Sequence, residues 1–293
     1  MRTNLPIVQS IPHAGLSVPL SVAGRLAIDD VTIYNECDLW NDQIFDFAHP
    51  SLHAAAPLAV AGMSSARVLI DANRPPDSLD NPDGAIKSHT SYGDPIYTTP
   101  LNRDEQQRLL AAEWQPFHTA LDTALRTHAR DVRLFLDCHN MAQHGPSAYG
   151  DPGKVRPRIC IANFGDAHGE AVAANGRISA PPEFARRAAE IAYDLFRDME
   201  LLEPDSSHPA PVVALNQPFV GGYILRHYCD PAYQQAIGGD YVGLMVEVNR
   251  GLFVGDQTTR TPIQPPNQER IAALRLRLHR WVQAILPLLE KTP

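Results

Sequence analysis

Two histidines in this sequence follow short apolar runs, at positions where buried strands would end. His13 comes after "PIVQSI" at residues 6–11, and His139 comes after "VRLFLDC" at residues 132–138. In an open α/β sheet, ligands bind beyond the carboxyl ends of the strands. A catalytic zinc takes three protein ligands and leaves one position open to water. The two histidines therefore indicate a metal site, whereas one alone would more often be a hydrogen-bonded loop residue.

A third ligand would have to be an oxygen donor from elsewhere in the chain. The segment "YNECDLWNDQIF" offers Glu36, Asp38 and Asp42. Asp38 and Asp42 are four residues apart and would share one face of a helix. Alternatively, Asp38 caps that helix and Glu36 is a solvated loop carboxylate. Spacing alone leaves all three residues open.

Glu247 lies within the apolar run "YVGLMVEVN" at residues 241–249 and should be largely buried. Burying an unpaired carboxylate is costly. Glu247 is therefore either paired with a neighbour such as Arg250 or placed to act as a general base. Burial suits the second role, because it raises a carboxyl pKa toward the working range. The same edge would also bring Arg250 close to the other polar residues.

Two further clusters could bind an anionic ligand. Asn73 and Arg74 follow "RVLIDA", and arginine presents a planar fork that suits a carboxylate. A surface salt bridge is the alternative for Arg74. In "QPFVGGYILRHYCDP", residues 217–231, paired glycines precede Tyr223 and Arg226 and permit close backbone approach. This run predicts a pocket wall, or else a tight turn with aromatic packing.

These residues need a framework of strands and helices to bring them together. Short apolar, β-branched runs predict strands at 6–11, 57–62, 67–73, 132–138, 158–164, 211–216 and 241–249. Apolar residues at helical spacing predict helices at 38–48, 102–129, 183–199 and 269–289. The alternation predicts an α/β fold with a mixed, mostly parallel central sheet and helices on both faces, in a single domain spanning residues 1–293. The loop at 74–100 should form a rim or lid.

Composition excludes several classes of function. The chain has 293 residues, 44 % of them hydrophobic, and a formal net charge of -8. This charge opposes binding to nucleic acid or an anionic membrane surface. The sequence contains no apolar stretch of membrane-spanning length and no pattern typical of a signal peptide. The four cysteines form no CxxC pair, so we expect a cytoplasmic protein without a disulfide framework.

Taken together, these motifs show that the chain resembles the N-formylglutamate amidohydrolase family. This family is a branch of the zinc-carboxypeptidase-like hydrolases, which also include aspartoacylase. The motifs that carry the resemblance occur in order along residues 6 to 250: "SIPHAG", "ECDLWNDQIFDFA", "LIDANRPP", "WQPFH", "LDCHNM" and "GGYILRHY". The chain departs from the family pattern at Ala14, Ala72 and Asn140, which leaves the acyl group and amino acid open.

The resemblance implies a mixed α/β sheet and a metal-dependent hydrolysis of an N-acyl bond on an acidic amino acid. N-formyl-L-glutamate is the expected small-molecule substrate, and histidine breakdown is the family's usual setting. The implied metal is Zn²⁺, although such sites also host Mn, Fe or Co. The alternatives are a related zinc amidohydrolase or carboxypeptidase acting on another N-acyl amino acid or peptide, and a non-catalytic carboxylate-binding protein.

The resemblance also implies roles for individual residues. His13 and His139 match the metal ligands, and the acidic segment should supply the third, for which Asp38 is favoured and Glu36 and Asp42 are held in reserve. Glu247 falls where the superfamily places its general base. The groups expected to bind the substrate are Asn73 and Arg74 at the α-carboxylate, Arg226 at a second anion, and Tyr223 and Arg250.

Overall fold

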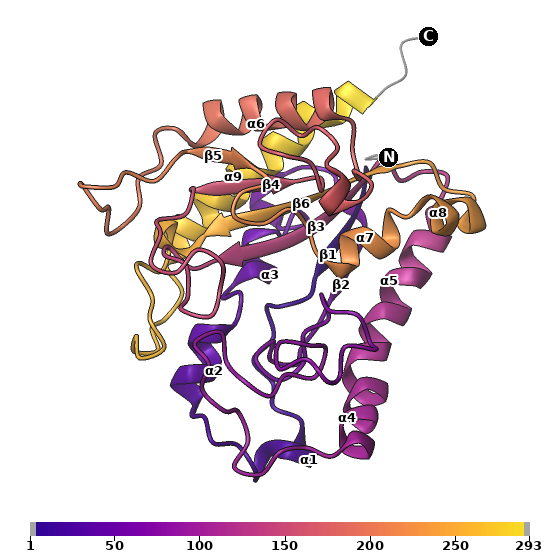
Figure 1. Ribbon diagram of the computed structural model, residues 1–293. Helices are drawn as coiled ribbons and strands as arrows, with labels where there is room; N and C mark the ends of the chain where they lie inside the picture. Colours follow the sequence, from indigo (N-terminus) through magenta and orange to yellow (C-terminus); the bar gives the residue numbers. More distant parts are fainter. Residues whose placement is uncertain (1–3, 290–293) are drawn as a thin grey trace.

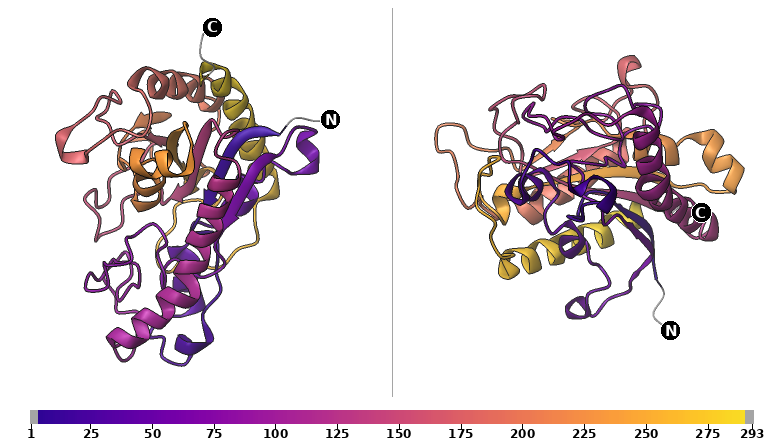
Figure 2. Two further views of the ribbon diagram at one scale, coloured as in Figure 1. Left: turned by 90° about the vertical axis from the view of Figure 1, so that its right-hand side faces the viewer. Right: turned by 90° about the horizontal axis from the view of Figure 1, so that it is seen from below.

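The computed structural model describes residues 4–289 and has a six-stranded sheet at its centre. Its strands are β1 (Leu5–Ile11), β2 (Pro57–Gly62), β3 (Leu134–Met141), β4 (Ile159–Ala162), β5 (Val213–Leu215) and β6 (Val242–Asn249). They lie in the order β2-β1-β3-β6-β4-β5. Helices cover both faces of the sheet (Figures 1 and 2). The predicted fold class, an α/β protein with a mixed and mostly parallel sheet, is confirmed.

The direction of the strands decides which strand ends meet. β2, β1, β3 and β6 pair in parallel, so their carboxyl ends lie along one edge. β4 pairs with β6 in the antiparallel direction, and β5 follows β4. As a result, the amino end of β4 reaches the edge where the carboxyl ends of β3 and β6 lie. Residues just before β4 can therefore join residues just after β3 and β6.

The longer helices lie where the apolar periodicity predicts them. The α-helices are α1 (Leu20–Ala23), α2 (Asp30–Glu36), α3 (Asn41–Ile44), α4 (Arg103–Leu109), α5 (Gln115–Thr127), α6 (Pro182–Phe196), α7 (Tyr223–Tyr228), α8 (Pro231–Ile237) and α9 (Gln268–Ile285). Asn102 and Glu105 form a reciprocal capping box that starts α4. A π-helical turn, Leu110–Trp114, joins α4 to α5, so residues 102–129 are nearly all helical as predicted.

Two local predictions are wrong. Residues 67–73 do not form a strand: Leu69 N and Ile70 N both donate to Ala66 O, which makes a turn, and only Ile70 forms an isolated bridge. The apolar side chains of this run are buried within a loop instead, so their composition reflects burial and not sheet pairing. Residues 38–48 contain only the short helix α3, because Trp40 just before it has a left-handed backbone conformation (φ 52°), through which an α-helix does not continue.

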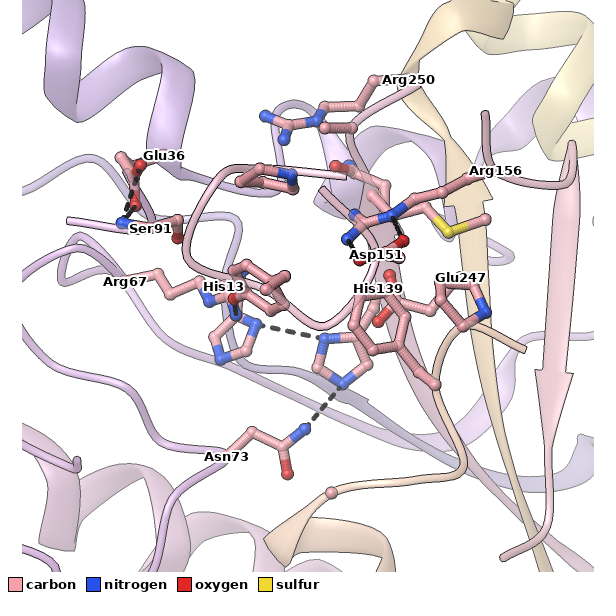
Figure 3. A pocket seen from close by; sticks show the side chains of 18 of the residues that line it. His13, Glu36, Arg67, Asn73, Ser91, His139, Asp151, Arg156, Glu247 and Arg250 are labelled. Atoms are coloured by element: carbon pink, nitrogen blue, oxygen red, sulfur yellow. Dashed lines mark hydrogen bonds and ion pairs between the residues drawn. The ribbon is translucent and has the colours of Figure 1, made fainter. Parts of the chain in front are cut away.

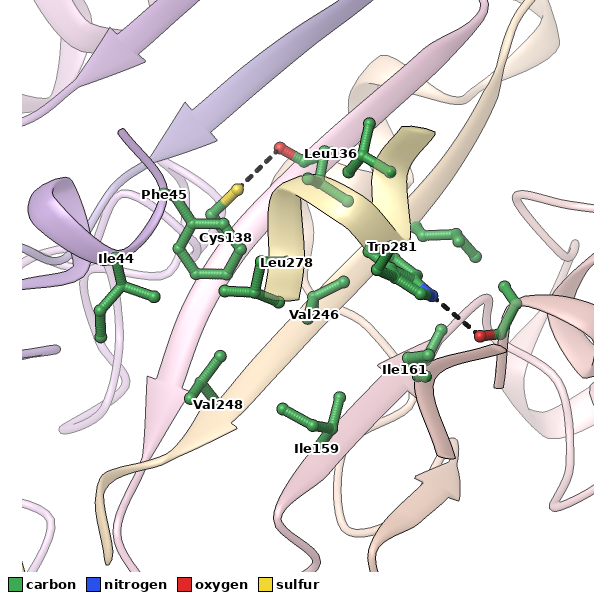
Figure 4. Close-up of a cluster of buried hydrophobic side chains, with 14 of the residues drawn as sticks. Ile44, Phe45, Leu136, Cys138, Ile159, Ile161, Val246, Val248, Leu278 and Trp281 are labelled. Atoms are coloured by element: carbon green, nitrogen blue, oxygen red, sulfur yellow. Dashed lines mark hydrogen bonds between the residues drawn. The ribbon is translucent and has the colours of Figure 1, made fainter. Parts of the chain in front are cut away.

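Strand alternation divides the interior into two layers, one on each face of the sheet. Along β3, Leu134, Leu136 and Cys138 face the layer that contains α6 and α9, and Phe135 faces the layer that contains α5 and α7. Figure 4 shows the first layer, in which Trp281 of α9 packs against the strands. Because side chains alternate along a strand, Asp137 and His139 point to the α5 and α7 side.

Other sequence expectations concern membranes and cysteines. Within residues 4–289, no helix is both long and apolar enough to cross a membrane. Cys37, Cys138, Cys160 and Cys229 are all free thiols. The prediction that the chain has no disulfide framework is therefore confirmed.

Helix α9 offers a direct test of the packing in the first layer. Leu278 is 1 % exposed and packs in this layer, whereas Leu276 on the same helix is 39 % exposed. We expect Leu278→Ala to lower the free energy of unfolding by about 2–5 kcal/mol, because it leaves a cavity. Leu276→Ala should change it by less than about 0.5 kcal/mol. Urea denaturation of both variants measures the difference, and equal losses would contradict the assigned packing.

Candidate metal centre and substrate cavity

A cavity of about 460 Å³ opens at the sheet edge where β3 and β6 end. His13, His139 and Glu247 line it from the ends of β1, β3 and β6. Its other walls come from the loops at 67–92 and 140–156 and from the turn at 218–222. Figure 3 shows these side chains pointing into a common space. The predicted gathering of polar residues at the sheet edge is therefore present.

Three buried side chains bring potential metal ligands together in this cavity. Nδ1 of His139 lies 3.1 Å from Nδ1 of His13 and 3.3 Å from Oδ2 of Asp38. Nδ1 of His13 lies 3.5 Å from the same Asp38 oxygen. His13, Asp38 and His139 thus form a buried cluster that could hold a metal ion.

The opposite nitrogen of each histidine faces a buried carboxylate. Nε2 of His13 lies 2.8 Å from Oδ1 of Asp71, and Nε2 of His139 lies 3.1 Å from Oδ2 of Asp137. A carboxylate accepts a proton, so Asp71 favours the His13 tautomer with the proton on Nε2 and a lone pair on Nδ1. Asp137 lies close to Nε2 of His139 without forming a hydrogen bond to it. The two Nδ1 atoms and an Asp38 oxygen converge on one point, an arrangement that a cation stabilises.

The spacing of the three atoms fits a divalent metal. Ligands at about 2.0–2.1 Å from a tetrahedral zinc are about 3.3 Å from one another. The distances of 3.1, 3.3 and 3.5 Å among the two Nδ1 atoms and the Asp38 oxygen bracket this value. Two imidazoles and one carboxylate are also a donor set that zinc accepts.

Asp38 is held in place from several sides. The backbone N–H of Asn140 donates to Asp38 Oδ2 at 3.2 Å, and the Asn140 side chain donates to Leu39 O at 2.9 Å. Burial by itself would raise the pKa of the Asp38 carboxyl, but His13, His139 and Arg67 together hold this pKa below its usual value. Asp38 is therefore charged when the cluster forms, as a metal ligand must be.

The two carboxylates held in reserve lie elsewhere. Both Glu36 oxygens accept from the backbone N–H of Ser91, at 3.1 and 3.0 Å, so Glu36 sits in the cavity wall away from the cluster. Asp42 is exposed and lines a separate surface depression near Phe45 and Met63. Of the three acidic residues considered from the sequence, Asp38 is the one beside both histidines.

Glu247 is the strand partner of His139 and lies beside it in the cavity (Figure 3). Its side chain is buried, and within residues 4–289 its Oε2 atom has no hydrogen-bond donor. Burial raises the pKa of Glu247 to about 7. The result is a carboxylate that faces the cavity and can exchange a proton near neutral pH.

Arg250 does not pair with Glu247, so the alternative that these two residues form a structural ion pair is wrong. Its NH1 atom donates to the backbone oxygens of Asn35 at 2.8 Å and Cys37 at 3.0 Å. Within the described part of the chain, Arg250 forms no ion pair with a carboxylate, and its Nε has no acceptor. This buried arginine therefore presents to the cavity a guanidinium that no described carboxylate pairs with directly.

Asn73 and Arg74 both line the cavity and are tied to their surroundings. Asn73 Nδ2 lies 3.4 Å from His139 Nε2, and its Oδ1 accepts from Ile224 N at 2.8 Å. Arg74 donates from NH2 to Asp83 Oδ2 at 2.7 Å and from Nε to Asp83 O at 3.0 Å. NH1 of Arg74 donates to Asn73 O at 3.3 Å and lies 3.9 Å from Asp71 Oδ2.

Two residues proposed from the sequence as ligand contacts lie outside the cavity. The Arg226 guanidinium stacks 4.0 Å from the Phe164 ring centroid and donates to Asn175 O at 2.8 Å. The Tyr223 ring packs against His227, with centroids 5.4 Å apart. The paired glycines before Tyr223 do line the cavity, so this turn forms part of a pocket wall as predicted.

Sequence reasoning missed two arginines of the cavity. Arg67 NH1 lies 3.6 Å from Asp38 Oδ1, and its Nε lies 3.4 Å from Asp71 Oδ2. Arg67 therefore links Asp38, a candidate metal ligand, to Asp71, the carboxylate bonded to His13. The i,i+4 spacing of Arg67 and Asp71 is a sequence signal for this pair, but it applies only to a helical turn and not to the strand predicted at 67–73. Arg156 makes a two-point pair with Asp151, at 2.7 and 2.9 Å. It precedes β4, whose antiparallel direction the sequence does not reveal.

The fold and cavity together define a class of protein: an α/β protein with a candidate metal centre at the carboxyl ends of its parallel strands. Comparisons with known proteins narrow this class. The family model of N-formylglutamate amidohydrolase matches residues 5–254. The chain belongs to the N-formylglutamate amidohydrolase family.

Individual relatives agree with this assignment. The chain is 28 % identical over 238 residues to N-formylglutamate deformylase of Pseudomonas putida, and the aligned region covers 78 % of this chain and 76 % of that protein. It is 26 % identical over 240 residues to the Pseudomonas aeruginosa enzyme of the same name, covering 78 % and 77 %. N-formylglutamate amidohydrolase from Ralstonia eutropha JMP134 shares the fold, with a TM-score of 0.65 at 20 % identity over 96 % of this chain and 95 % of that one.

Metal binding tests the assignment of the third ligand. We expect Asp38→Asn to weaken zinc binding at least about 100-fold. The substitution removes the negatively charged oxygen ligand from a site whose two other protein ligands are neutral nitrogens. Asp42→Asn makes the same change four residues away at an exposed site and should bind zinc as the unmodified protein does. Equilibrium dialysis with elemental analysis measures both. If Asp42→Asn loses the metal and Asp38→Asn retains it, the assignment is wrong.

Proposed function

We propose that this protein hydrolyses N-formyl-L-glutamate to formate and glutamate in a zinc-dependent reaction. The observation that carries the proposal is the position of Glu247, a buried carboxylate with an unpaired oxygen, beside the His13–Asp38–His139 cluster. The names of the relatives, which describe deformylases and amidohydrolases of N-formylglutamate, support the choice of substrate.

His13, Asp38 and His139 would hold the metal, with zinc as the proposed ion and Mn, Fe or Co as alternatives. When bound, zinc acts as a Lewis acid on a carbonyl and lowers the pKa of water at its open position to about 7. Asp71 and Asp137 orient the two imidazoles for this task. Such carboxylates also raise the basicity of a histidine ligand.

Glu247 would act as the general base and then as the general acid. Its free Oε2 would take a proton from the attacking water and pass it to the nitrogen of the departing amine. Arg67 places a positive charge next to the cluster, where negative charge develops on the acyl oxygen during attack. Both residues are positioned before substrate arrives, so little reorganisation is needed.

Two cationic groups of the cavity would bind the two carboxylates of the substrate. Asn73 and Arg74, which both line the cavity, would bind the α-carboxylate. Arg250, which has no carboxylate partner within the described residues, would bind the side-chain carboxylate, a role that the sequence suggested for Arg226. A buried arginine favours a carboxylate over a neutral side chain because the charge is otherwise uncompensated.

A screen of N-acyl amino acids tests the substrate assignment. We expect turnover of N-formyl-L-glutamate, much slower turnover of N-formyl-L-leucine, and loss of activity with a chelator that added zinc restores. The cavity volume by itself also suits larger ligands, so N-acetyl-L-glutamate belongs in the panel. Turnover of the acetyl compound alone would indicate a related amidohydrolase. No turnover of any compound, with or without zinc, would contradict an enzymatic function.

Glu247→Gln tests the general base. The substitution keeps the shape of the side chain but removes its ability to accept a proton, so we expect kcat to fall about 10²–10⁴-fold while zinc stays bound. Glu36→Gln is the matched control, because it neutralises another buried carboxylate of the same cavity wall. It should change kcat far less. Near-full activity of Glu247→Gln in a steady-state assay would rule out the assigned role.

A further inference from the structure

The helix behind the cavity contacts the main chain of the turn that carries Asn73 and Arg74. Trp114 Nε1 donates to Arg74 O at 3.2 Å, and His118 donates from Nε2 to Ala72 O at 2.9 Å. The two acceptors lie on either side of Asn73. Neither Trp114 nor His118 lines the cavity, so both act on the turn from outside it.

The two donors form one rigid unit. Trp114 and His118 are four residues apart on a helix and so share a face. Their rings stack with centroids 3.7 Å apart and an angle of 26° between the planes. Both side chains are buried, and Tyr228 packs against the other side of the His118 ring, with centroids 5.9 Å apart. The rings therefore cannot easily turn away from the two carbonyl groups.

His118 is fixed in one protonation state. A carbonyl oxygen can only accept, so Nε2 of His118 must bear the proton that reaches Ala72 O. Burial lowers the pKa of His118 to about 4, so the ring is neutral at pH 7 and Nδ1 is an acceptor. The Tyr228 hydroxyl lies 3.0 Å from Nδ1 and 3.1 Å from His118 O, and its one proton can be donated to either acceptor. The donor to Ala72 is thus present across the neutral pH range.

The helix is irregular where it meets the turn. Residues Leu110–Trp114 form a π-helical turn, and Pro116 follows it in the first turn of α5. Proline has no N–H to bond the carbonyl four residues earlier, which accounts for the break in the regular ladder. The extra residue in this turn changes the register of the helix at Trp114. Such insertions often occur at functional sites.

The side chain of Asn73 is fixed from the other direction. Its Oδ1 accepts from Ile224 N at the start of α7. A Cβ atom at Gly222 would lie 2.2 Å from Asn73 Nδ2, so the glycine leaves room for this amide. The main chain of the turn is therefore held by α5 and the side chain of Asn73 by α7.

We propose that Trp114 and His118 are positioning residues, which set the Ala72–Arg74 turn so that Asn73 and Arg74 can bind the substrate carboxylate. This inference rests on the proposed function, in which these two side chains contact substrate. It adds that the geometry of the carboxylate site depends on two hydrogen bonds made outside the cavity. Small displacements of a binding group can cost up to about 10²-fold in rate, so the effect should be measurable.

The test compares donors with matched non-donors. Trp114→Phe removes the indole N–H and keeps an aromatic ring, and His118→Met removes the imidazole donor while His118→Gln retains a donor near Nε2. Trp281→Phe is the control, since Trp281 Nε1 donates to a buried carbonyl, Ala188 O, at 2.8 Å on the opposite face of the sheet. Each variant is assayed for kcat and KM with N-formyl-L-glutamate, for bound zinc, and for amide hydrogen exchange of residues 70–74.

We expect Trp114→Phe and His118→Met to raise KM about 10-fold, with kcat changed less than about 2-fold and zinc content unchanged. His118→Gln should recover most of the loss, and Trp281→Phe should lower stability without raising KM. Unchanged KM in Trp114→Phe and His118→Met, or an equal rise in Trp281→Phe, would overturn the proposal.

Hydrogen exchange separates this proposal from the proposed function. If the unmodified protein turns over none of the N-acyl amino acids, the proposed function fails, and amide exchange at residues 70–74 decides whether Trp114 and His118 hold the turn. Faster exchange there in Trp114→Phe and His118→Met than in Trp281→Phe supports the positioning role. Equal exchange in all three variants contradicts it.

Discussion

Two imidazole nitrogens face one another across 3.1 Å, and the rest of the site depends on keeping them there. Nε2 of His13 is hydrogen-bonded to Asp71, and Nε2 of His139 lies 3.1 Å from Asp137. Both carboxylates are buried behind the rings and help to orient them toward Asp38. The donor set is therefore built by the residues that surround it as much as by the ligands.

This concentration of carboxylates sets the charge balance of the cavity. Asp38, Asp71 and Asp137 are buried within a short distance of one another, and Arg67 lies between the first two. Because burial alone disfavours charge, such a cluster needs cations close by. Glu247 is buried with one oxygen unpaired, and burial raises its pKa to about 7. The burial that makes a cation favourable at the histidines thus also lets Glu247 exchange a proton near neutral pH.

The sheet separates this charged region from the apolar core. Side chains alternate along β3 and β6, so His139 and Glu247 share one face while Cys138, Val246 and Val248 pack beneath them on the other. Figure 4 shows α9 packed against the face of the sheet that carries Cys138, Val246 and Val248. The polar residues are therefore attached to strands whose opposite face is fully packed, which limits their movement. Rigid placement of this kind is what a reaction with little reorganisation requires.

The sequence by itself determined the fold class, the positions of most strands and long helices, and the residues that follow the strands, because hydrophobic period and strand ends are local properties. It narrowed the third ligand to a segment, but only the tertiary structure put Asp38 beside both histidines. It also misread residues 67–73 as a strand, since apolar composition reports burial and not pairing. Only the tertiary structure placed Arg156 in the cavity, because the direction of β4 depends on its pairing with a distant strand. Likewise, only the structure shows that Arg250 has no carboxylate paired with it among residues 4–289, because its contacts come from segments far away in the sequence.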